Sequence, residues 1–389
     1  MVTIHKTGQE HRLACRSSAF TIPTAGQAPI HLQANLLVLP KKYADDFRLL
    51  CHRNPVPCPL LAESASPGDF RQLKSYVQSA DGRRILAVAD NIDLRHDFPR
   101  YRVYHNSEHV PVDGVREPTD VAAQWSAGDH VGFLVGCSFS FERALHEAGL
   151  TPQHMTHRRN VPMFRTNIPL CPAGVFTGGT YVVSMRPYRM SDVEEVRDIT
   201  RPFGATHGEP VAWGWDGAER IGIEDVARPD WGDQAVKADG VTVFAHGDEE
   251  LVPVFWGCGV TPQEAVMKAG LEGTVMGHAP GHMIVLDVRE DESRHFRPIT
   301  AAVVVLCVVL CVVVLCVVVL CVVVLCVVVL CVVFVPVALV LPKGLPSANF
   351  QANPPLHRPN GVELVQQFWA QLGSKSFFAR PKKPYAEPT

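Results

Sequence analysis

The sequence predicts an α/β fold, in which a smaller two-layer α+β lobe is inserted into a three-layer αβα lobe. Two observations predict it. A strand–turn–helix pattern occurs twice, at 131–149 and 252–270, and this pattern is typical of α/β sheets. Between the two copies, apolar runs at 181–185 and 210–213 flank a helical pattern at 192–199, which predicts a separate β-α-β lobe.

The first expected elements lie upstream of the first copy. Residues 36–39 form a short apolar run that predicts a buried strand, and Pro40 ends it. Apolar residues at helical spacing over 43–50 predict a helix after this strand. Residues 54–125 are rich in Pro, Asp and Arg and predict loops and short strands. The last strand is expected at 283–288.

The two strand–turn–helix copies share individual residues as well as their pattern. Each strand leads into a glycine–cysteine turn, and Ser140 or Thr261 follows as a candidate helix N-cap. Identical residues match at Gly136/Gly257, Cys137/Cys258, Ala144/Ala265, Ala148/Ala269, Gly149/Gly270 and Leu150/Leu271. An internal duplication would explain these matches. The alternative is the ordinary recurrence of such units in α/β sheets.

One folded domain is expected over 12–290, ahead of two C-terminal segments. Its larger lobe is expected at about 20–155 and 250–288, and its smaller lobe at about 160–245. A low-complexity apolar run (301–341) and an unassigned, irregular tail (343–389) follow.

The apolar run repeats Val-Val-Val-Leu-Cys and holds no charged side chain between Ala301 and Val335. Hydropathy predicts a transmembrane segment here. However, a helix over this run would be ~52 Å long, whereas the hydrocarbon core of a bilayer is ~30 Å thick. A five-residue period also gives no constant packing face in a helix or a strand. A translated tandem DNA repeat, a membrane anchor and a structured core element remain the three interpretations.

Composition narrows the function class. The formal net charge is −3 and no Lys/Arg stripe stands out, so a nucleic-acid partner is not expected. Six of the twelve cysteines lie in the apolar run, and none of the others forms a CxxC pair. Neither a metal site nor a disulfide framework is therefore predicted. The sequence also lacks a GxGxxG fingerprint, a Walker A loop and a GxSxG elbow, so no cofactor is expected.

The N-terminus shows no apolar signal-peptide core. With the reduced thiols, this predicts a cytoplasmic protein. The alternatives are a mitochondrial protein with a short transit peptide and a single-pass membrane protein anchored through 301–335.

Candidate site residues fall in five segments. In the turn after the first copy's strand, Cys137 could be a thiolate nucleophile, and the N–H groups that follow it, from Ser138 onward, could bind an oxyanion. The alternatives are that Cys137 only packs and that Ser140 only caps. In the loop 158–167, Arg165 and Asn167 are suited to a carboxylate, unless they are surface residues in ion pairs.

The third segment holds His278 and His282, which Pro280-Gly281 separates by a turn. An acid–base role fits them better than metal binding, because no third ligand is evident from spacing. A structural role in the turn is the alternative. The last candidates, His207 and Asp233, lie in Gly/Pro-rich loops, where catalytic residues and turn residues are both common.

Seven motifs occur together and in order between residues 131 and 288, within a likeness that runs from about residue 20 to residue 288. They are VGFLVGCSFSFERAL, RNVPMFRTNIP, VVSMRP, HGEPVAWG, GIEDVARPDWGD, VPVFWGCGVTPQEAV and HAPGHMIVLDV. With them the chain resembles the D-glutamate cyclase family, whose bacterial members are labelled hydro-lyases. RNVPMFRTNIP and HAPGH are shared with the bacterial members. The mitochondrial members lack both motifs and have an extra C-terminal domain, which leaves the substrate open.

The resemblance implies the two-lobed fold described above and the conversion of D-glutamate into 5-oxo-D-proline and water. In this hypothesis Arg165 and Asn167 bind the substrate carboxylates, with Ser140 and His207 as further contacts. The N–H groups after Cys137 stabilise the oxyanion, and His278, His282 or Asp233 supplies the acid and the base.

Two alternatives remain, a hydro-lyase acting on another small hydroxy acid and a non-catalytic protein that binds a small carboxylate. The expected partner is a small carboxylate in each case. A membrane becomes a partner only if 301–335 is a genuine segment. The sequence leaves the oligomeric state open.

Overall fold

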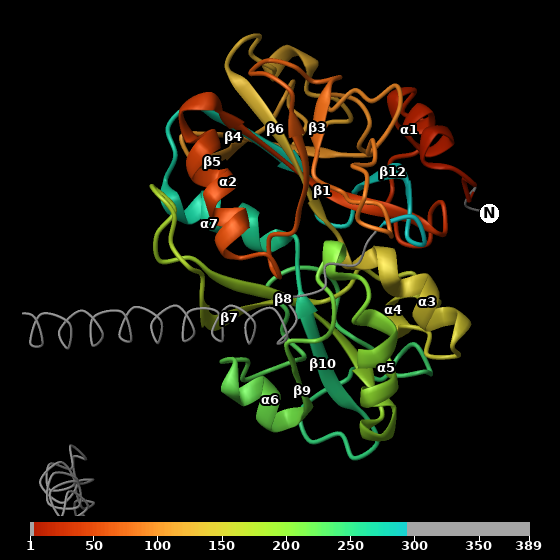
Figure 1. Cartoon of the computed structure of the whole chain (residues 1–389). Coiled ribbons are helices and arrows are strands. Elements are labelled where there is room, and N and C mark those ends of the chain that lie inside the picture. Colours follow the sequence, from red (N-terminus) through yellow and green to blue (C-terminus); the bar gives the residue numbers. More distant parts are fainter. Residues whose placement is uncertain (1–3, 294–389) are drawn as a thin grey trace, which may run out of the picture. The chain divides into compact units, whose positions relative to one another are not determined.

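A computed structural model describes residues 4–293 of the chain. This part holds two β-sheets with helices around them (Figure 1), so the mixed α/β class is confirmed. The apolar run and the tail lie outside the described residues. Within the described part, no helix is long and apolar enough to cross a membrane.

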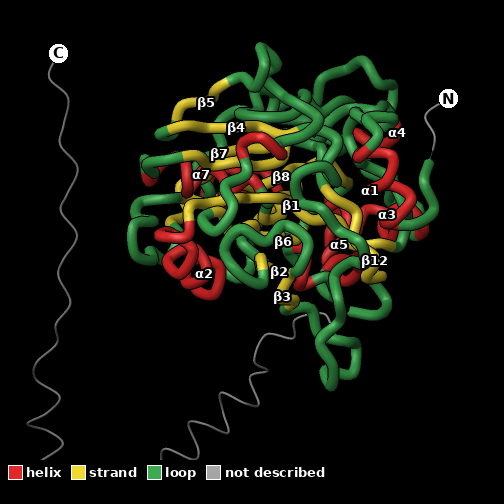
Figure 2. The backbone as a smooth tube through the Cα atoms, turned by 90° about the horizontal axis from the view of Figure 1, so that it is seen from above, coloured by secondary structure: helices red, strands yellow, loops and turns green. Residues whose placement is uncertain are grey.

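The larger sheet has the strand order β3-β2-β6-β1-β11-β4-β5, with β12 also paired to β1. Each of its strand pairs is antiparallel. β1 lies in its middle, with β6 along one side (Figure 2). β11 and β12 pair with its other side. The strands are β1 (His31–Pro40), β2 (Leu60–Ser64), β3 (Leu73–Ser75), β4 (Tyr101–His105), β5 (Glu108–Val110), β6 (His130–Gly136), β11 (Thr274–His278) and β12 (Ile284–Arg289).

The smaller sheet has the order β7-β8-β10-β9 and is also antiparallel. Its strands are β7 (Met163–Pro169), β8 (Thr180–Tyr188), β9 (Ala212–Trp213) and β10 (Val252–Gly257). The strand near 252 was expected in the larger lobe, but it pairs with β8 instead. An apolar run predicts a buried strand without indicating which sheet receives it.

The helices are α1 (Gly8–Arg16), α2 (Ala44–Arg53), α3 (Glu142–Glu147), α4 (Gln153–Thr156), α5 (Val193–Thr200), α6 (Gly214–Arg220) and α7 (Val260–Ala269). Five 3₁₀ turns accompany them: η1 (Lys41–Tyr43), η2 (Ala122–Gln124), η3 (Ser138–Phe141), η4 (Met190–Asp192) and η5 (Gly204–Thr206).

The two faces of the larger sheet pack differently. Alternate residues of β1 point to opposite faces. Leu37 and Leu39 pack on one face with apolar residues of α2 and α7. Leu36 and Val38 pack on the other with residues of the loop-rich segment 77–125. The three-layer αβα arrangement is not evident in these contacts.

The two strand–turn–helix copies occupy equivalent places in the two sheets. Ala34 of β1 pairs with Gly136 at the end of β6, and Val183 of β8 pairs in the same way with Gly257 at the end of β10. The strands that follow each copy lie in the other sheet: β7 follows the first copy, and β11 and β12 follow the second. There β7 pairs with β8 at Val183, and β12 pairs with β1 at Ala34. The domain thus has two intertwined halves, one with β1, β6 and β7 and the other with β8, β10, β11 and β12. Their equivalent strand register favours an internal duplication.

The hydroxyl groups of the two turns also have equivalent partners. The Gln33 N–H donates to Ser140 Oγ at 3.0 Å, and the Val182 N–H donates to Thr261 Oγ1 at 2.9 Å. Neither hydroxyl makes an N-cap hydrogen bond to its own helix, contrary to the expectation from the sequence. Instead, each one fastens its turn to the neighbouring strand.

Candidate active site

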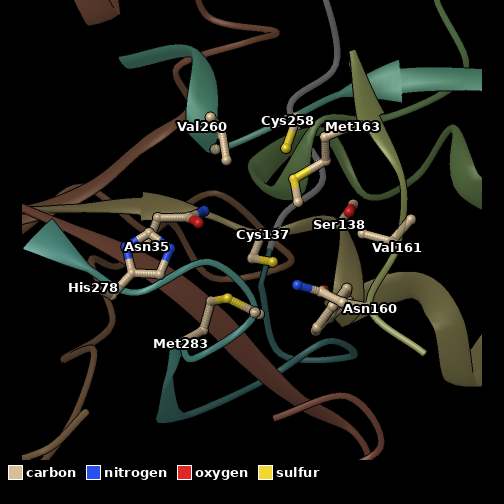
Figure 3. A pocket seen from close by; sticks show the side chains of 13 residues that line it. Asn35, Cys137, Ser138, Asn160, Val161, Met163, Cys258, Val260, His278 and Met283 are labelled. Carbon is tan, nitrogen blue, oxygen red and sulfur yellow. The ribbon is translucent and has the colours of Figure 1, made fainter. Parts of the chain in front are cut away.

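A small pocket of about 20 Å³ opens where the two halves meet, beside the turns after β6 and β10 (Figure 3). This volume holds about one water molecule, so a larger ligand requires the lining side chains to move apart. Several residues in it are equivalent between the halves, including Cys137 and Cys258. The pocket's lining residues share the absence of a charged side chain. They are Asn35, Cys137, Ser138, Phe139, Asn160, Val161, Met163, Cys258, Gly259, Val260, His278, Gly281 and Met283.

His278 ends β11 and is 1% exposed. Its Nδ1 accepts a hydrogen bond from the Leu36 N–H at 3.2 Å and lies 2.9 Å from Gln263 Nε2. Nδ1 also lies 3.3 Å from the Leu36 carbonyl, but the Leu36 N–H can only donate and the Gln263 amide is closer, so we assign the acceptor role to Nδ1 and the ring proton to Nε2. Nε2 makes no hydrogen bond within residues 4–293. Burial lowers the pKa of His278 to about 3, so the ring is neutral and offers a hydrogen-bond donor to the pocket.

The two thiols of the pocket are weak nucleophiles. Burial raises the pKa of Cys137 well above its usual value and that of Cys258 to about 11. Both sulfurs therefore stay protonated near neutral pH, whereas the reactive form of cysteine is the thiolate. The geometry favours the packing interpretation of Cys137 over the nucleophile.

Behind Ser138 lies a buried ionic cluster that the sequence analysis did not identify as functional. Arg186 is fully buried and donates through Nη2 to Ser138 Oγ at 3.1 Å and to Glu142 Oε1 at 2.5 Å. His154 Nε2 lies 2.9 Å from the same carboxylate oxygen. Burial alone would raise the pKa of Glu142, but the nearby His154 and Arg186 outweigh it and lower that pKa. An arginine inside the apolar strand VVSMRP was the available signal, because a buried charge requires a partner.

Beside the pocket, the two halves differ in the size of two neighbouring side chains, and the two differences compensate for each other. Asn35 donates through Nδ2 to the carbonyls of Val135 and Gly136, at 3.1 and 2.8 Å. A Cβ at Gly259 would lie 1.8 Å from that Nδ2. In the other half, Ser184 stands in the place of Asn35 and Ser138 in the place of Gly259. A large side chain on the strand therefore goes with glycine in the turn, and a small one goes with serine.

This compensation predicts a coupled pair of substitutions. Gly259→Ser should destabilise the fold by about 1–3 kcal/mol, because the new side chain overlaps Asn35. In the Asn35→Ser background the same substitution should cost at least about 1 kcal/mol less, as expected for residues in contact. Urea unfolding of the four proteins of this cycle measures the difference. If the losses in the free energy of unfolding of the two single variants simply add in the double variant, the size compensation between Asn35 and Gly259 is contradicted.

Three of the predicted site residues lie together at this pocket, namely Cys137, Ser138 and His278. The structure does not bring Arg165 there. Its half-exposed guanidinium pairs with Asp230 and Glu264 and lies over the Trp231 ring at 4.3 Å.

The other predicted residues do not line the pocket either. Asn167 donates to the Arg220 carbonyl at 3.2 Å, and Asp233 accepts the Asn160 N–H at 2.7 Å. Asp233 thus fixes the loop that carries Asn160, which lines the pocket. His282 Nδ1 lies 2.9 Å from the Pro280 carbonyl. His207 Nδ1 lies 2.8 Å from the carbonyl of Val56, and Ser140 Oγ accepts the hydrogen bond from the Gln33 N–H.

Three buried histidines predict acid sensitivity. Burial lowers the pKa of His11 and His278 to about 3 and that of His207 to about 4, from 6.5. Below pH 6.5 the unfolded chain binds protons that the folded chain does not, so stability should fall as the pH decreases from 6.5 towards 4. Each ring contributes about 1.4 kcal/mol per pH unit in this window. Urea midpoints at pH 7, 6 and 5 measure the slope, and a midpoint independent of pH would contradict the prediction.

Comparison with known proteins gives a consistent result. A family model described as D-glutamate cyclase matches residues 131–287. A protein of Schizosaccharomyces pombe named "putative hydro-lyase" is 45% identical over 282 residues, which cover 72% of this chain and 83% of that protein. Proteins of the same name from Rubrobacter xylanophilus and Bordetella pertussis are each 43% identical, over 73% and 74% of this chain and 96% and 92% of their own.

Among solved structures, the chain is similar to a nitrogen repressor-like protein from Methanococcus jannaschii. The TM-score is 0.29 at 9% identity, over 75% of this chain and 99% of that one. A score this low supports no conclusion about fold or function.

Proposed function

Because the chain belongs to the D-glutamate cyclase family, we propose that it converts D-glutamate into 5-oxo-D-proline and water in the pocket between its two halves. The amine of the substrate attacks the carbon of the side-chain carboxyl group. One C–N bond forms, one C–O bond breaks, and the departing oxygen leaves as water.

The observation that carries this proposal is the neutral His278, whose Nε2–H is available to the pocket. A neutral imidazole donor can polarise a carboxyl oxygen and stabilise the negative charge that develops as the amine attacks. It is a weak base, because the pKa of its conjugate acid is low. His278 therefore acts as an electrophile here and not as the general base.

The uncharged lining supports the same reaction. With no carboxylate among the lining residues, an ammonium group would be buried without a counter-ion, which is costly. The neutral amine, the form that can attack, is accommodated more easily. Asn160 Oδ1 is buried with no partner in the described part of the chain and can accept an N–H from that amine.

This site differs from the one expected from the sequence. The α-carboxylate of the substrate would be held by neutral hydrogen-bond donors, while its side-chain carboxyl group enters protonated. The guanidinium of Arg165 is not needed for this role. His282, Asp233, Asn167, His207 and Ser140 would act by shaping the loops and turns around the pocket.

A hydro-lyase that acts on another small hydroxy acid is the second candidate. The uncharged lining fits this reaction equally well, because a hydroxyl group needs no anionic partner.

Product identity separates the two. Wild-type protein is incubated with D-glutamate, L-glutamate and 2-hydroxy acids, and the products are identified by mass and by chiral chromatography. The proposal expects 5-oxo-D-proline from D-glutamate. An unsaturated acid from a hydroxy acid, with D-glutamate untouched, would support the second candidate instead.

A further inference from the structure

We propose that Ser138 carries a proton from the attacking nitrogen to the departing oxygen, and that the buried Arg186 positions it for this task. The inference rests on the proposed cyclisation. It assigns a catalytic role to Ser138 and a positioning role to Arg186.

The reaction requires such a transfer. When the neutral amine attacks the protonated side-chain carboxyl, the nitrogen must lose one proton and the departing hydroxyl must gain one. A hydroxyl group can serve both needs, because it gives its own proton to the departing oxygen and takes the proton of the nitrogen. Ser138 then ends in its starting state, and no net charge enters the uncharged pocket.

Ser138 is placed for this role. It is the one hydroxyl residue among those that line the pocket in the described chain, and it is 4% exposed. Its Oγ accepts a hydrogen bond from Arg186 Nη2 at 3.1 Å. This bond occupies a lone pair of Oγ and leaves the Oγ–H without an acceptor among residues 4–293. The proton can therefore be directed to a substrate oxygen.

Arg186 has little freedom to do anything else. Its Nε and Nη2 donate to Glu142 Oε1 at 3.1 and 2.5 Å, and its Nη1 donates to Ser184 Oγ at 3.1 Å. The rings of Phe141 and Trp256 lie 5.1 and 5.2 Å from its guanidinium carbon. A guanidinium fixed in this way stabilises the negative charge that grows on Oγ as its proton leaves.

The comparison of the two halves supports the assignment. Leu37 occupies the place of Arg186 in the first sheet, and Gly259 occupies the place of Ser138 in the second turn. The serine and its arginine thus occur in one half of the pocket. Glu142 and Gln263 are also equivalent, and each contacts an imidazole, that of His154 or that of His278. The electrophile and the proton carrier therefore approach the pocket from opposite halves.

The test compares full-length variants with D-glutamate as substrate. Ser138→Ala should lower kcat by at least ~100-fold and change KM by less than about threefold, because the hydroxyl acts in the reaction and not in binding. Ser138→Gly copies the residue of the equivalent turn, so it should fold and show the same loss. Ser64→Ala is the matched control, since Ser64 is buried and hydrogen-bonded but outside the pocket. Its kcat should stay within about twofold of wild type.

Arg186 is tested through Ser138. Arg186→Lys should lower kcat in the wild-type background and change it by less than about twofold when Ser138 is already alanine, because the two residues act as a unit. If the losses in kcat from the two substitutions multiply, Arg186 has a general structural role, and its positioning role is overturned. Full turnover by Ser138→Ala or Ser138→Gly would overturn the proton transfer and leave the cyclase proposal standing. A wild-type protein that leaves D-glutamate unchanged would remove both.

Discussion

Arg186→Met is expected to destabilise the folded protein by about 3–5 kcal/mol, because it removes the guanidinium that pairs with the buried Glu142 carboxylate. Both side chains are almost fully buried, and their 2.5 Å contact joins β8 to α3. The double variant Arg186→Met/Glu142→Leu should recover most of this loss, since it leaves no uncompensated charge. Urea unfolding followed by circular dichroism measures all three proteins.

Arg201→Met provides the control for this measurement. Arg201 forms a surface pair with Asp198, with half of its own side chain exposed, and the loss should be below about 1 kcal/mol. A cost for Arg186→Met as small as that of Arg201→Met would contradict the buried ionic cluster. A double variant less stable than Arg186→Met would contradict it as well.

His278→Phe is expected to lower kcat for D-glutamate by about 10²–10³-fold, the usual effect of losing one donor to a developing oxyanion. Phenylalanine keeps a ring of similar size and removes the Nε2–H. Since the pKa of His278 is lowered to about 3, the wild-type kcat should show no titration near pH 6.5. Initial rates from pH 5.5 to pH 9 test both statements.

His105→Phe is the matched control, because His105 lies exposed at the end of β4, outside the pocket. Its kcat should remain at the wild-type value. A pH profile that loses activity with an apparent pKa near 6.5, and becomes flat in His278→Phe, would make His278 a general base and contradict the neutral donor.

The local elements could be read from the sequence. The apolar runs and turns at 131–149 and 252–270 became β6 with η3 and α3, and β10 with α7. The matched residues of these copies also pointed to the duplication. The sheet that receives each strand depends on pairing between distant segments, which a local pattern does not encode. For that reason β10 was assigned to the wrong sheet.

The candidate site was predicted only in part, for a similar reason. Cys137, Ser138 and His278 could be found because turns beside buried strands are common sites. The tautomer of His278 depends on contacts with Leu36 and Gln263. Leu36 is distant in sequence from both of the other residues. Arg165 was predicted to bind a substrate carboxylate, but the carboxylates of Asp230 and Glu264 already pair with it. Arg186 was missed because one charge in an apolar strand shows its partners only after folding.

The central claim is that the pocket between the two halves takes up the substrate, and methionine methyl signals test it most directly. Met163 and Met283 both line the pocket, whereas Met190 is exposed and Met276 is buried in the core of the larger sheet. The full chain, labelled at its methionine methyl groups and assigned with single Met→Leu variants, is titrated with 5-oxo-D-proline and followed by NMR. We expect the signals of Met163 and Met283 to shift together and saturate, while those of Met190 and Met276 stay in place. Saturable shifts elsewhere, with Met163 and Met283 unchanged, would contradict it.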